Sequence, residues 1–345
     1  MRPDDAAMPI GVDIGSRWIK LVQARPLGRG RFTVGAAAVI PRPAPAEPGF
    51  PPGAEEAQSI ADAILRGGFV ADRVSVVLPH EMAMIDQLEL PPSDSGAPVE
   101  ALAASEAAAL HACEPAALEI RCWELPRLRR SRDQAAWMTA ACRRADLDAM
   151  LDALEEAGLD PVHVGTASWA TAEAVRASAA MRADPAVAVL DLGWRAARLA
   201  VLRGPEVIFE RELPDRGLRA VVEAVAVRLG VEPDLAEHLL RRGDAGPAGE
   251  DVRAVVSAST DSLREEVARS VAYAAPRVPE PGVARVLVTG GGAACGITPP
   301  ADGQLPCAPA TPATLLGLAG RTPHAAAALP QCVPALGMSI WGCCA

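Results

Sequence analysis

Apolar residues follow two different periods along this chain, and short glycine or proline segments separate the stretches that they define. Apolar or alternating runs typical of strands occupy residues 18–24, 31–40, 73–79, 161–164, 187–191, 196–202, 206–213 and 284–288. Apolar side chains three or four positions apart, which indicate helices, cover residues 54–66, 146–157, 167–181, 218–228, 234–241 and 252–273. Strands that alternate with helices in this way predict an α/β fold.

Residues 81–141 form a block with an α+β pattern of its own. Its strand-like and helical runs cover residues 82–90, 98–112, 118–125 and 134–141. We expect this block to be a subdomain inserted into a first lobe, which comprises residues 8–80 with 142–182. The remaining residues, 183–345, are expected to form a second lobe.

The same local unit occurs twice: an apolar strand, an Asp-x-Gly turn and a two-stranded hairpin. The turn of the first copy begins at Asp13 and that of the second at Asp191. An internal repeat of a supersecondary unit indicates a duplicated architecture. The equivalent positions are Asp13 and Asp191, Gly15 and Gly193, Arg17 and Arg195, and Lys20 and Arg198.

Three glycine turns, each after an apolar strand, point to a nucleotide site. The first contains Asp13, Gly15 and Ser16, the second Asp191 and Gly193, and the third Gly290, Gly291 and Gly292. Backbone amides in such turns can face phosphate oxygens, and glycine lets the backbone approach a ligand closely. We therefore expect the two hairpins to hold the phosphates across a cleft, with the triple glycine beside the adenosine.

Three charged side chains complete the expected site. Lys20 is the only lysine of a chain whose other basic positions are arginine, and a compact ammonium suits a contact with the β- or γ-phosphate. Asp13 and Asp191 are expected to face the same cleft, where two carboxylates would orient a hydrated Mg²⁺ that keeps several of its waters. ATP and Mg²⁺ are therefore the expected cofactors.

Composition narrows the class of protein. Of the 345 residues, 50% are hydrophobic and 22% are charged, a balance typical of a globular chain. The net charge of −10 argues against nucleic acid as a partner and against a broad attraction to anionic lipid. The eight cysteines show no CxxC or Cys/His spacing, which favours free thiols in a reducing cytoplasm over zinc sites or disulfides.

Both ends of the chain favour a cytoplasmic protein without a direct membrane span. The acidic N-terminus runs directly into the first strand, which is not the pattern of a signal peptide. Pro330 and Pro334 interrupt the uncharged tail and leave too short an apolar run to cross a bilayer. A buried terminal helix over residues 334–341 is expected instead.

These motifs resemble those of the actin-like ATPases, which include actin, sugar kinases and FtsA-type cell-division proteins. Within that superfamily the chain is most similar to the PilM family of type IV pilus assembly proteins. The similar stretches follow the same order over nearly the whole chain and read IGVDIGSRWIKLVQ, VVLPHEMAMIDQLELP, VEALAASEAAAL, ADLDAMLDALEEAGLDPVHV, AVLDLGWRAARLAVLRGPEVIFERELP, RVLVTGGG and PALGMSIW.

The resemblance implies an actin-like, ribonuclease H-like duplicated fold. Two lobes would surround a nucleotide cleft, and residues 81–141 would be the FtsA-style extra subdomain. The resemblance also implies a partner, the cytoplasmic N-terminal peptide of the inner-membrane protein PilN, together with other pilus assembly proteins. The chain would then be recruited to the inner face of the inner membrane, with ATP as a structural or switching ligand.

The second phosphate turn departs from the family pattern. Trp194 is bulky where backbone amides would approach phosphate, and the hydroxyl residues usual after Gly193 are missing. Arg195 or Arg198 would compensate by binding the anion. The alternative, which we favour, is that Arg198 lies on the solvated face of its hairpin.

The sequence assigns no residue to catalysis. Actin-like enzymes position the attacking water with an acidic or amide side chain, but near the central helix only His163 and Glu173 are available. We expect His163 to be structural and Glu173 to lie on the helix surface, so efficient hydrolysis is not predicted. Three alternatives stay open: a nucleotide-free adaptor with the same fold and partner, a component of a related secretion system or an FtsA-like relative, and a small-molecule kinase. For the carboxylate base that such a kinase needs we find no candidate.

Overall fold

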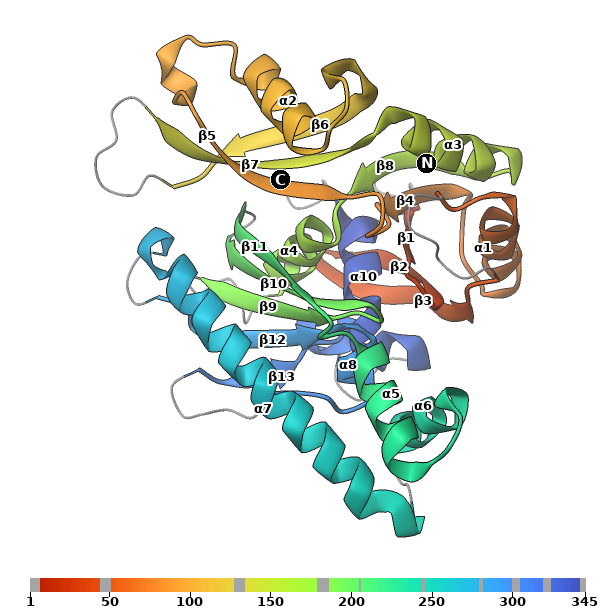
Figure 1. Ribbon diagram of the computed structural model, residues 1–345. Helices are drawn as coiled ribbons and strands as arrows, with labels where there is room; N and C mark the ends of the chain where they lie inside the picture. Colours follow the sequence, from red (N-terminus) through yellow and green to blue (C-terminus); the bar gives the residue numbers. More distant parts are fainter. Residues whose placement is uncertain are drawn as a thin grey trace.

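The computed structural model describes residues 7–43, 51–126, 134–178, 186–204, 206–243, 246–278, 282–299, 305–318 and 324–341, and two large sheets organise them (Figure 1). The first sheet contains β1 (Ile10–Ile14), β2 (Trp18–Gly28), β3 (Arg31–Pro41), β4 (Arg73–Val77) and β8 (Asp160–Gly165), in the order β3-β2-β1-β4-β8. The second contains β9 (Val187–Leu192), β10 (Ala196–Arg203), β11 (Glu206–Pro214), β12 (Val286–Thr289) and β13 (Cys307–Pro309), in the order β11-β10-β9-β12-β13.

The two large sheets have the same topology, which confirms the duplicated α/β fold. In each, the first strand pairs antiparallel with the second strand, and the second pairs antiparallel with the third. Two parallel strands then follow on the other side of the first strand. Asp13 pairs with Lys20, and Asp191 pairs with Arg198. The predicted equivalence of the two hairpins therefore holds residue by residue.

Helices cover the outer face of each large sheet. On the first sheet these are α1 (Ala54–Arg66) and α3 (Arg144–Glu156), whose apolar stripes share one core with the strands. On the second sheet they are α5 (Leu218–Leu229) and the long α7 (Gly249–Ala274). α6 (Pro233–Arg242) packs beside α5. Among the described residues, no helix is both long enough and apolar enough to cross a membrane.

Two helices lie between the large sheets and join them: α4 (Ala167–Ala177) and α10 (Val333–Ile340). α10 packs on β1, β2, β4 and α4, and all eight of its residues are buried. The predicted terminal helix is therefore confirmed. Because α4 and α10 share one apolar core with strands of both sheets, they hold the two hairpins in a fixed relation.

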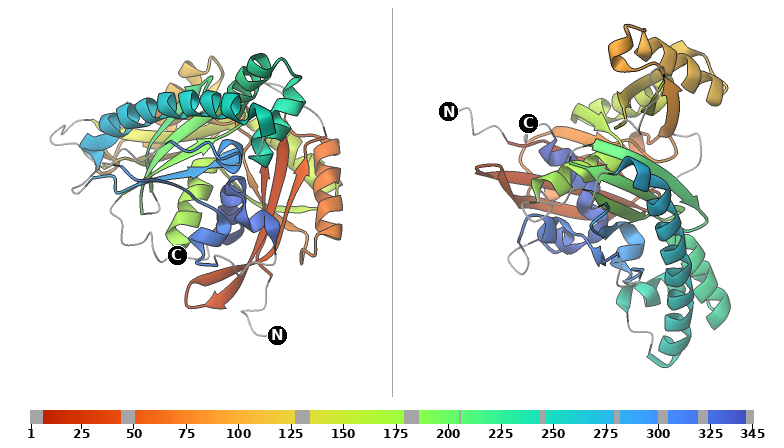
Figure 2. Two further views of the ribbon diagram at one scale, coloured as in Figure 1. Left: turned by 90° about the horizontal axis from the view of Figure 1, so that it is seen from below. Right: turned by 90° about the vertical axis from the view of Figure 1, so that its left-hand side faces the viewer.

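A third, smaller sheet stands at one end of the molecule (Figures 1 and 2). It contains β5 (Met84–Leu90), β6 (Leu118–Glu124) and β7 (Ala135–Arg143), in the order β5-β7-β6. Both pairings are antiparallel. α2 (Val99–Leu110) covers one face of this sheet, where Leu88, Ala103 and Trp137 are buried together. On the other face, Met138 and the neighbouring Leu125 are buried in one core with strands of the second large sheet.

The remaining elements are short, and none of them is predicted by the sequence pattern because three to five residues carry no usable period. They are α8 (Gly290–Ala294), α9 (Pro312–Leu315) and 3₁₀ turns at Ser93–Ser95, Pro115–Ala117, Gly246–Ala248, Ala275–Arg277, Ala325–Ala328 and Pro330–Cys332. Several boundaries also differ by one to four residues, most of all the ends of β2 and α4. β2 continues past residue 24 because its last residues keep pairing with β3. α4 ends at Ala177, and the expected end at residue 181 lies outside the described residues.

Gly337 allows α10 to touch α4. A Cβ at this position would lie 1.6 Å from the backbone oxygen of Ala170, an atom that cannot move unless α4 moves. We expect Gly337→Ala to lower the free energy of unfolding by about 3 kcal/mol, measured from the urea midpoint. Gly53→Ala is the control, because a Cβ there would meet no atom within 4 Å. Equal midpoints for the two variants would contradict this packing.

Candidate functional site

The turns after β1 and β9 line one narrow cleft, which has about 120 Å³ of free space. Its wall includes the sequence-predicted residues Asp13, Gly15, Ser16, Lys20, Asp191, Gly193, Gly290 and Gly291. Gly292 does not line the cleft and packs beside it, where a Cβ would lie 2.8 Å from Cβ of Leu192. The fold thus brings every predicted site residue except Gly292 onto the wall of one cleft.

Lys20 is held inside the first turn. Its Nζ lies 2.9 Å from Oδ2 of Asp13 and 3.3 Å from the backbone oxygen of Trp18. Gly15 leaves room for this ammonium, since a Cβ there would lie 2.5 Å from Nζ. Because an ammonium carries three hydrogens, these two contacts leave one hydrogen for a ligand in the cleft.

Asp191 lies in a less favourable environment for a charge. Burial raises the pKa of its carboxyl to about 6, and the negative charge of Asp13 adds to this rise. Lys20 lowers the pKa, as does a hydrogen bond of 3.2 Å that Oγ1 of Thr289 donates to Oδ1 of Asp191. The two carboxylates repel each other across the cleft, and a bound cation would relieve that repulsion.

The cleft offers few metal ligands of its own. Within the described ranges, no group of three or more His, Cys, Asp and Glu side chains is placed to hold a metal ion. Asp13 and Asp191 are nevertheless oxygen donors of the kind that Mg²⁺ prefers, and this ion normally keeps several waters. The residues present therefore fit a hydrated Mg²⁺, which Asp13 and Asp191 would hold through water.

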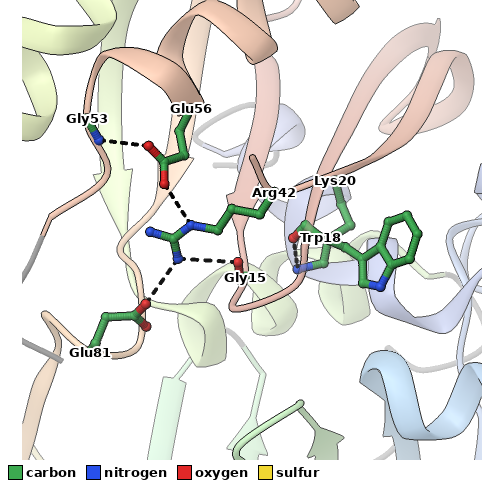
Figure 3. Close-up of polar contacts among 7 residues, drawn as sticks. All are labelled: Gly15, Trp18, Lys20, Arg42, Gly53, Glu56 and Glu81. Atoms are coloured by element: carbon green, nitrogen blue, oxygen red, sulfur yellow. Dashed lines mark hydrogen bonds and ion pairs between the residues drawn. The ribbon is translucent and has the colours of Figure 1, made fainter. Parts of the chain in front are cut away.

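A buried arginine that the sequence motifs do not reveal supports the first turn (Figure 3). Arg42 donates to Oε1 of Glu56 at 2.9 Å and to Oε1 of Glu81 at 3.2 Å. Its Nη1 also lies 3.5 Å from the backbone oxygen of Gly15. The Arg42, Glu56 and Glu81 side chains are only 3%, 7% and 6% exposed, so this triad is part of the interior. Glu56 also accepts a hydrogen bond from the backbone of Gly53 at the start of α1.

Comparison with known proteins places the chain in a family. A family model described as type IV pilus assembly protein PilM matches residues 11–299. The chain belongs to the PilM family. A search of curated proteins finds no match.

Solved structures agree with this assignment at the level of the fold. A "PilM-PilN type IV pilus biogenesis complex" is 21% identical, with a TM-score of 0.70 over 96% of this chain and 98% of that chain. The ethanolamine utilization protein EutJ from Carboxydothermus hydrogenoformans is 15% identical, with a TM-score of 0.53 over 98% and 90%. A glycerol dehydratase reactivase is 12% identical, with a TM-score of 0.50 over 98% and 100%. These likenesses establish the actin-like fold that PilM proteins share.

In this PilM-family chain, Trp194 makes a contact between the two lobes. The guanidinium of Arg17 lies over its ring, 4.7 Å from the centroid, and donates to Glu237 of α6 at 2.8 Å. A second pair stands beside the first, because Arg241 lies 5.1 Å from the ring centroid of Trp18 and 2.7 Å from Glu237. These contacts connect the hairpin of one lobe to α6 and the hairpin of the other, and they account for the narrowness of the cleft.

The prediction that Arg198 lies on a solvated face is wrong. Its side chain is 19% exposed and lines the cleft, because β10 is an inner strand whose face packs toward α4. Burial lowers the pKa of its guanidinium, and the neighbouring carboxylates of Glu210 and Glu212 oppose that shift.

A small pocket of about 20 Å³ beside Arg198 is also lined by Glu210. Burial raises the pKa of the Glu210 carboxyl. The sequence gives no sign of this acid, which lies 19 positions after Asp191 on a different strand.

The two candidates near the central helix lie away from the two Asp-x-Gly turns. Glu173 is buried at 8% exposure and pairs with Arg176. Its predicted surface position is wrong because α4 lies between the two large sheets, where most of its faces are covered. His163 is exposed on β8, away from the wall of the cleft. Neither residue is placed to act on a ligand there.

A second and larger site in this PilM-family chain is a groove of about 550 Å³ between the third sheet and the first lobe. β6 and β7 supply Arg121, Trp123 and Ala140 to its wall, while β8 and α4 supply Gly165 and Trp169. Consecutive residues of β6, from Glu119 to Trp123, line the groove, so it follows the edge of this strand and not a single face of the sheet.

Three of the six tryptophans of the chain gather in the groove. Trp123 and Trp169 meet edge to face at 5.2 Å, and Trp169 stacks on Trp341 at 5.7 Å. Trp123 donates to the backbone oxygen of Val207 at 2.9 Å. The indole nitrogen of Trp169 is buried without a hydrogen-bond partner among the described residues. Sequence reasoning misses this cluster because its members lie on three separate segments of the chain.

Proposed function

We propose that this chain is a pilus-assembly adaptor that binds ATP with Mg²⁺ in the cleft and a membrane partner's peptide in the groove. The observation that carries the nucleotide half is the meeting of two equivalent Asp-x-Gly turns in one cleft, with Lys20 inside the first turn. Backbone amides beside Gly15, Ser16 and Gly193 would face the phosphates. The segment 290–292 would lie beside the adenosine.

The charge of the cleft supports a polyphosphate ligand. Its wall carries five cationic side chains, Arg17, Lys20, Arg195, Arg198 and Arg241, against three carboxylates, Asp13, Glu81 and Asp191. Arg17 and Arg241 are paired with Glu237, and Arg198 with Glu212. Lys20 and Arg195 are therefore the cationic groups of the wall that would face an anionic ligand most directly. Asp13 and Asp191 would hold Mg²⁺ through water, and the ion, when bound, would neutralise phosphate charge.

A thermal unfolding experiment tests the nucleotide half. A ligand that binds only the folded state stabilises it by about 2.7 kcal/mol at a concentration about 100 times its Kd. Mg-ATP should therefore raise the Tm of the full chain, and AMP should raise it less because AMP lacks the β- and γ-phosphates. An unchanged Tm at saturating Mg-ATP would count against nucleotide binding.

The groove supports the partner half of the proposal, in which the occupant is the cytoplasmic N-terminal peptide of a PilN-like inner-membrane protein. β6 and β8, which both contribute to its wall, are edge strands of their sheets in the described part of the chain. An extended peptide can add its backbone to such an edge, and the tryptophan cluster would receive its apolar side chains. Likeness to a PilM-PilN complex supports this class of partner. Peptide capture would recruit the chain to the inner face of the inner membrane.

Ala140→Arg tests the groove directly. The new side chain would fill the space between β7 and α4, so we expect the affinity for the labelled partner peptide to fall at least about tenfold, equivalent to 1.4 kcal/mol. Ala254→Arg is the matched control, because Ala254 is exposed on α7. Fluorescence anisotropy measures both affinities. Equal affinities in two variants that fold normally would place the peptide elsewhere.

A nucleotide-free adaptor is a second candidate, favoured by the contacts that narrow the cleft. The pairs Arg17 with Trp194 and Arg241 with Trp18 stand where a nucleotide would enter. In this version Asp13→Ala leaves peptide affinity unchanged, and Mg-ATP does not shift the Tm of the wild type. Loss of peptide capture in a folded Asp13→Ala variant would contradict it.

A further inference from the structure

The hairpin formed by β2 and β3 extends beyond the body of the protein. In both views of Figure 2 its tip projects past the neighbouring elements. Pairing continues to the last residues, where Arg25 lies opposite Thr33 and Gly28 opposite Arg31. The tip is therefore an ordered two-stranded structure that presents its side chains at a fixed place.

The tip is strongly basic. Arg25, Arg29 and Arg31 are all exposed, and none of them has an acidic partner among the described residues. No Asp or Glu occurs between residues 14 and 46, in a chain whose net charge is −10. The three guanidiniums therefore create a positive patch that no carboxylate of the described residues neutralises through an ion pair.

The turn has an arginine at a position whose backbone conformation favours other residue types. Arg29 and Gly30 have φ angles of 54° and 66°, as a tight hairpin turn with two left-handed residues requires. Asn, Asp and Gly suit the first of these positions, and another L-residue costs roughly 1–2 kcal/mol there. Residues in strained backbone conformations occur often at functional sites, so Arg29 is a candidate for a functional role. The charge of Arg29 is the property that Asn or Gly would lose.

An apolar side chain stands among these charges. Leu27 is 52% exposed and lies between Arg25 and Arg29 in the sequence. Guanidiniums beside an exposed leucine match the interface of a bilayer, where cations meet lipid headgroups and an apolar group reaches the acyl boundary. Because the tip projects from the body of the protein (Figure 2), it can approach an extended surface such as a bilayer.

We propose that the tip of this hairpin, residues 25–31, docks on an anionic lipid surface. Each arginine near such a surface strengthens binding about fivefold, the ratio equivalent to about 1 kcal/mol. Three arginines give a weak and salt-sensitive contact, which becomes effective when a second anchor holds the protein close to the membrane. Weak binding of the chain alone to vesicles at low salt requires neither a nucleotide nor a peptide, so the failure of this proposal and that of the proposed function are separable.

Flotation of the full chain with vesicles tests this proposal. The probe is a vesicle of phosphatidylethanolamine with phosphatidylglycerol, and a phosphatidylcholine vesicle is the neutral reference. We expect the wild type to float with the anionic vesicles at low salt, and this binding to weaken as salt rises. The triple variant Arg25→Gln, Arg29→Gln and Arg31→Gln should lower the partition coefficient about hundredfold, the product of about fivefold for each arginine.

Matched variants distinguish the effect of the hairpin arginines from the effect of net charge. Replacement of Arg242, Arg253 and Arg269 by Gln makes the same charge change on exposed positions of α6 and α7 and should leave flotation unchanged. Replacement of the three hairpin arginines by Lys should keep it. Two results would overturn the proposal: equal flotation of the wild type with neutral and anionic vesicles, or equal flotation of the triple Gln variant and the wild type with anionic vesicles. If, in addition, the wild type binds polyglutamate and the triple Gln variant does not, the tip binds an acidic protein instead.

Discussion

Replacing Arg42 with methionine is expected to lower the free energy of unfolding by about 3–5 kcal/mol, because it leaves two buried carboxylates without their cation. Glu56 and Glu81 lie 2.9 and 3.2 Å from this guanidinium, and each is less than a tenth exposed. Methionine retains much of the apolar stem, so the loss reflects charge more than volume. Equilibrium urea unfolding followed by circular dichroism measures it.

The triad also offers its own control. Combining Arg42→Met with Glu56→Gln and Glu81→Gln removes both carboxylates together with their cation, and a neutral substitute for a buried ion group can be nearly as stable as the original. We therefore expect the triple variant to recover most of the lost stability. If Arg42→Met alone unfolds at the wild-type midpoint, the triad is not a structural support of the first turn.

The second large effect is expected on ligand affinity. Lys20→Met should weaken ATP binding about tenfold to hundredfold, because a hydrogen bond to a charged group contributes about 1.5–3 kcal/mol. Nζ lies 2.9 Å from Asp13 at the cleft wall, so the ammonium is already in place for a phosphate. Titration of a fluorescent ATP analogue at constant Mg²⁺ gives both affinities.

Two variants make the Lys20 result interpretable. Arg73→Met removes one exposed positive charge from the same lobe and should leave ATP affinity unchanged. Asp13→Asn with Lys20→Met removes both members of the ion pair, so a fold damaged only by an unpaired Asp13 should recover its stability but not its affinity. Unchanged ATP affinity in Lys20→Met would make this lysine a relic of the fold.

The parts of this fold that follow local rules could be predicted from the sequence. The repeated hairpins carry their strand pattern and their glycine turn within a few residues, so the equivalence of Asp13 with Asp191 and of Lys20 with Arg198 could be predicted. α1 covers the predicted residues 54–66 for the same reason. The periodicity of apolar residues, however, does not show which elements pack on each face of a helix. The burial of Glu173 could therefore not be predicted.

The contacts that shape the candidate site depend on long-range packing. Arg42 meets Glu81 across 39 positions, and Arg17 meets Glu237 across 220. Arg198 is covered because a helix from the other half of the chain packs toward its strand, which no pattern near Arg198 records. The roles of the predicted nucleotide residues, Gly292 included, stay predictions that ligand binding has to test.

Equilibrium titration of the full wild-type chain with a fluorescent ATP analogue, with and without Mg²⁺, tests the central claim most directly. Saturable binding that ATP and ADP displace, and that weakens when Mg²⁺ is withdrawn, is the predicted result, because Asp13 and Asp191 then repel the phosphates without an intervening cation. Absence of binding at millimolar ligand to a folded chain would contradict the claim and leave the fold as a nucleotide-free adaptor.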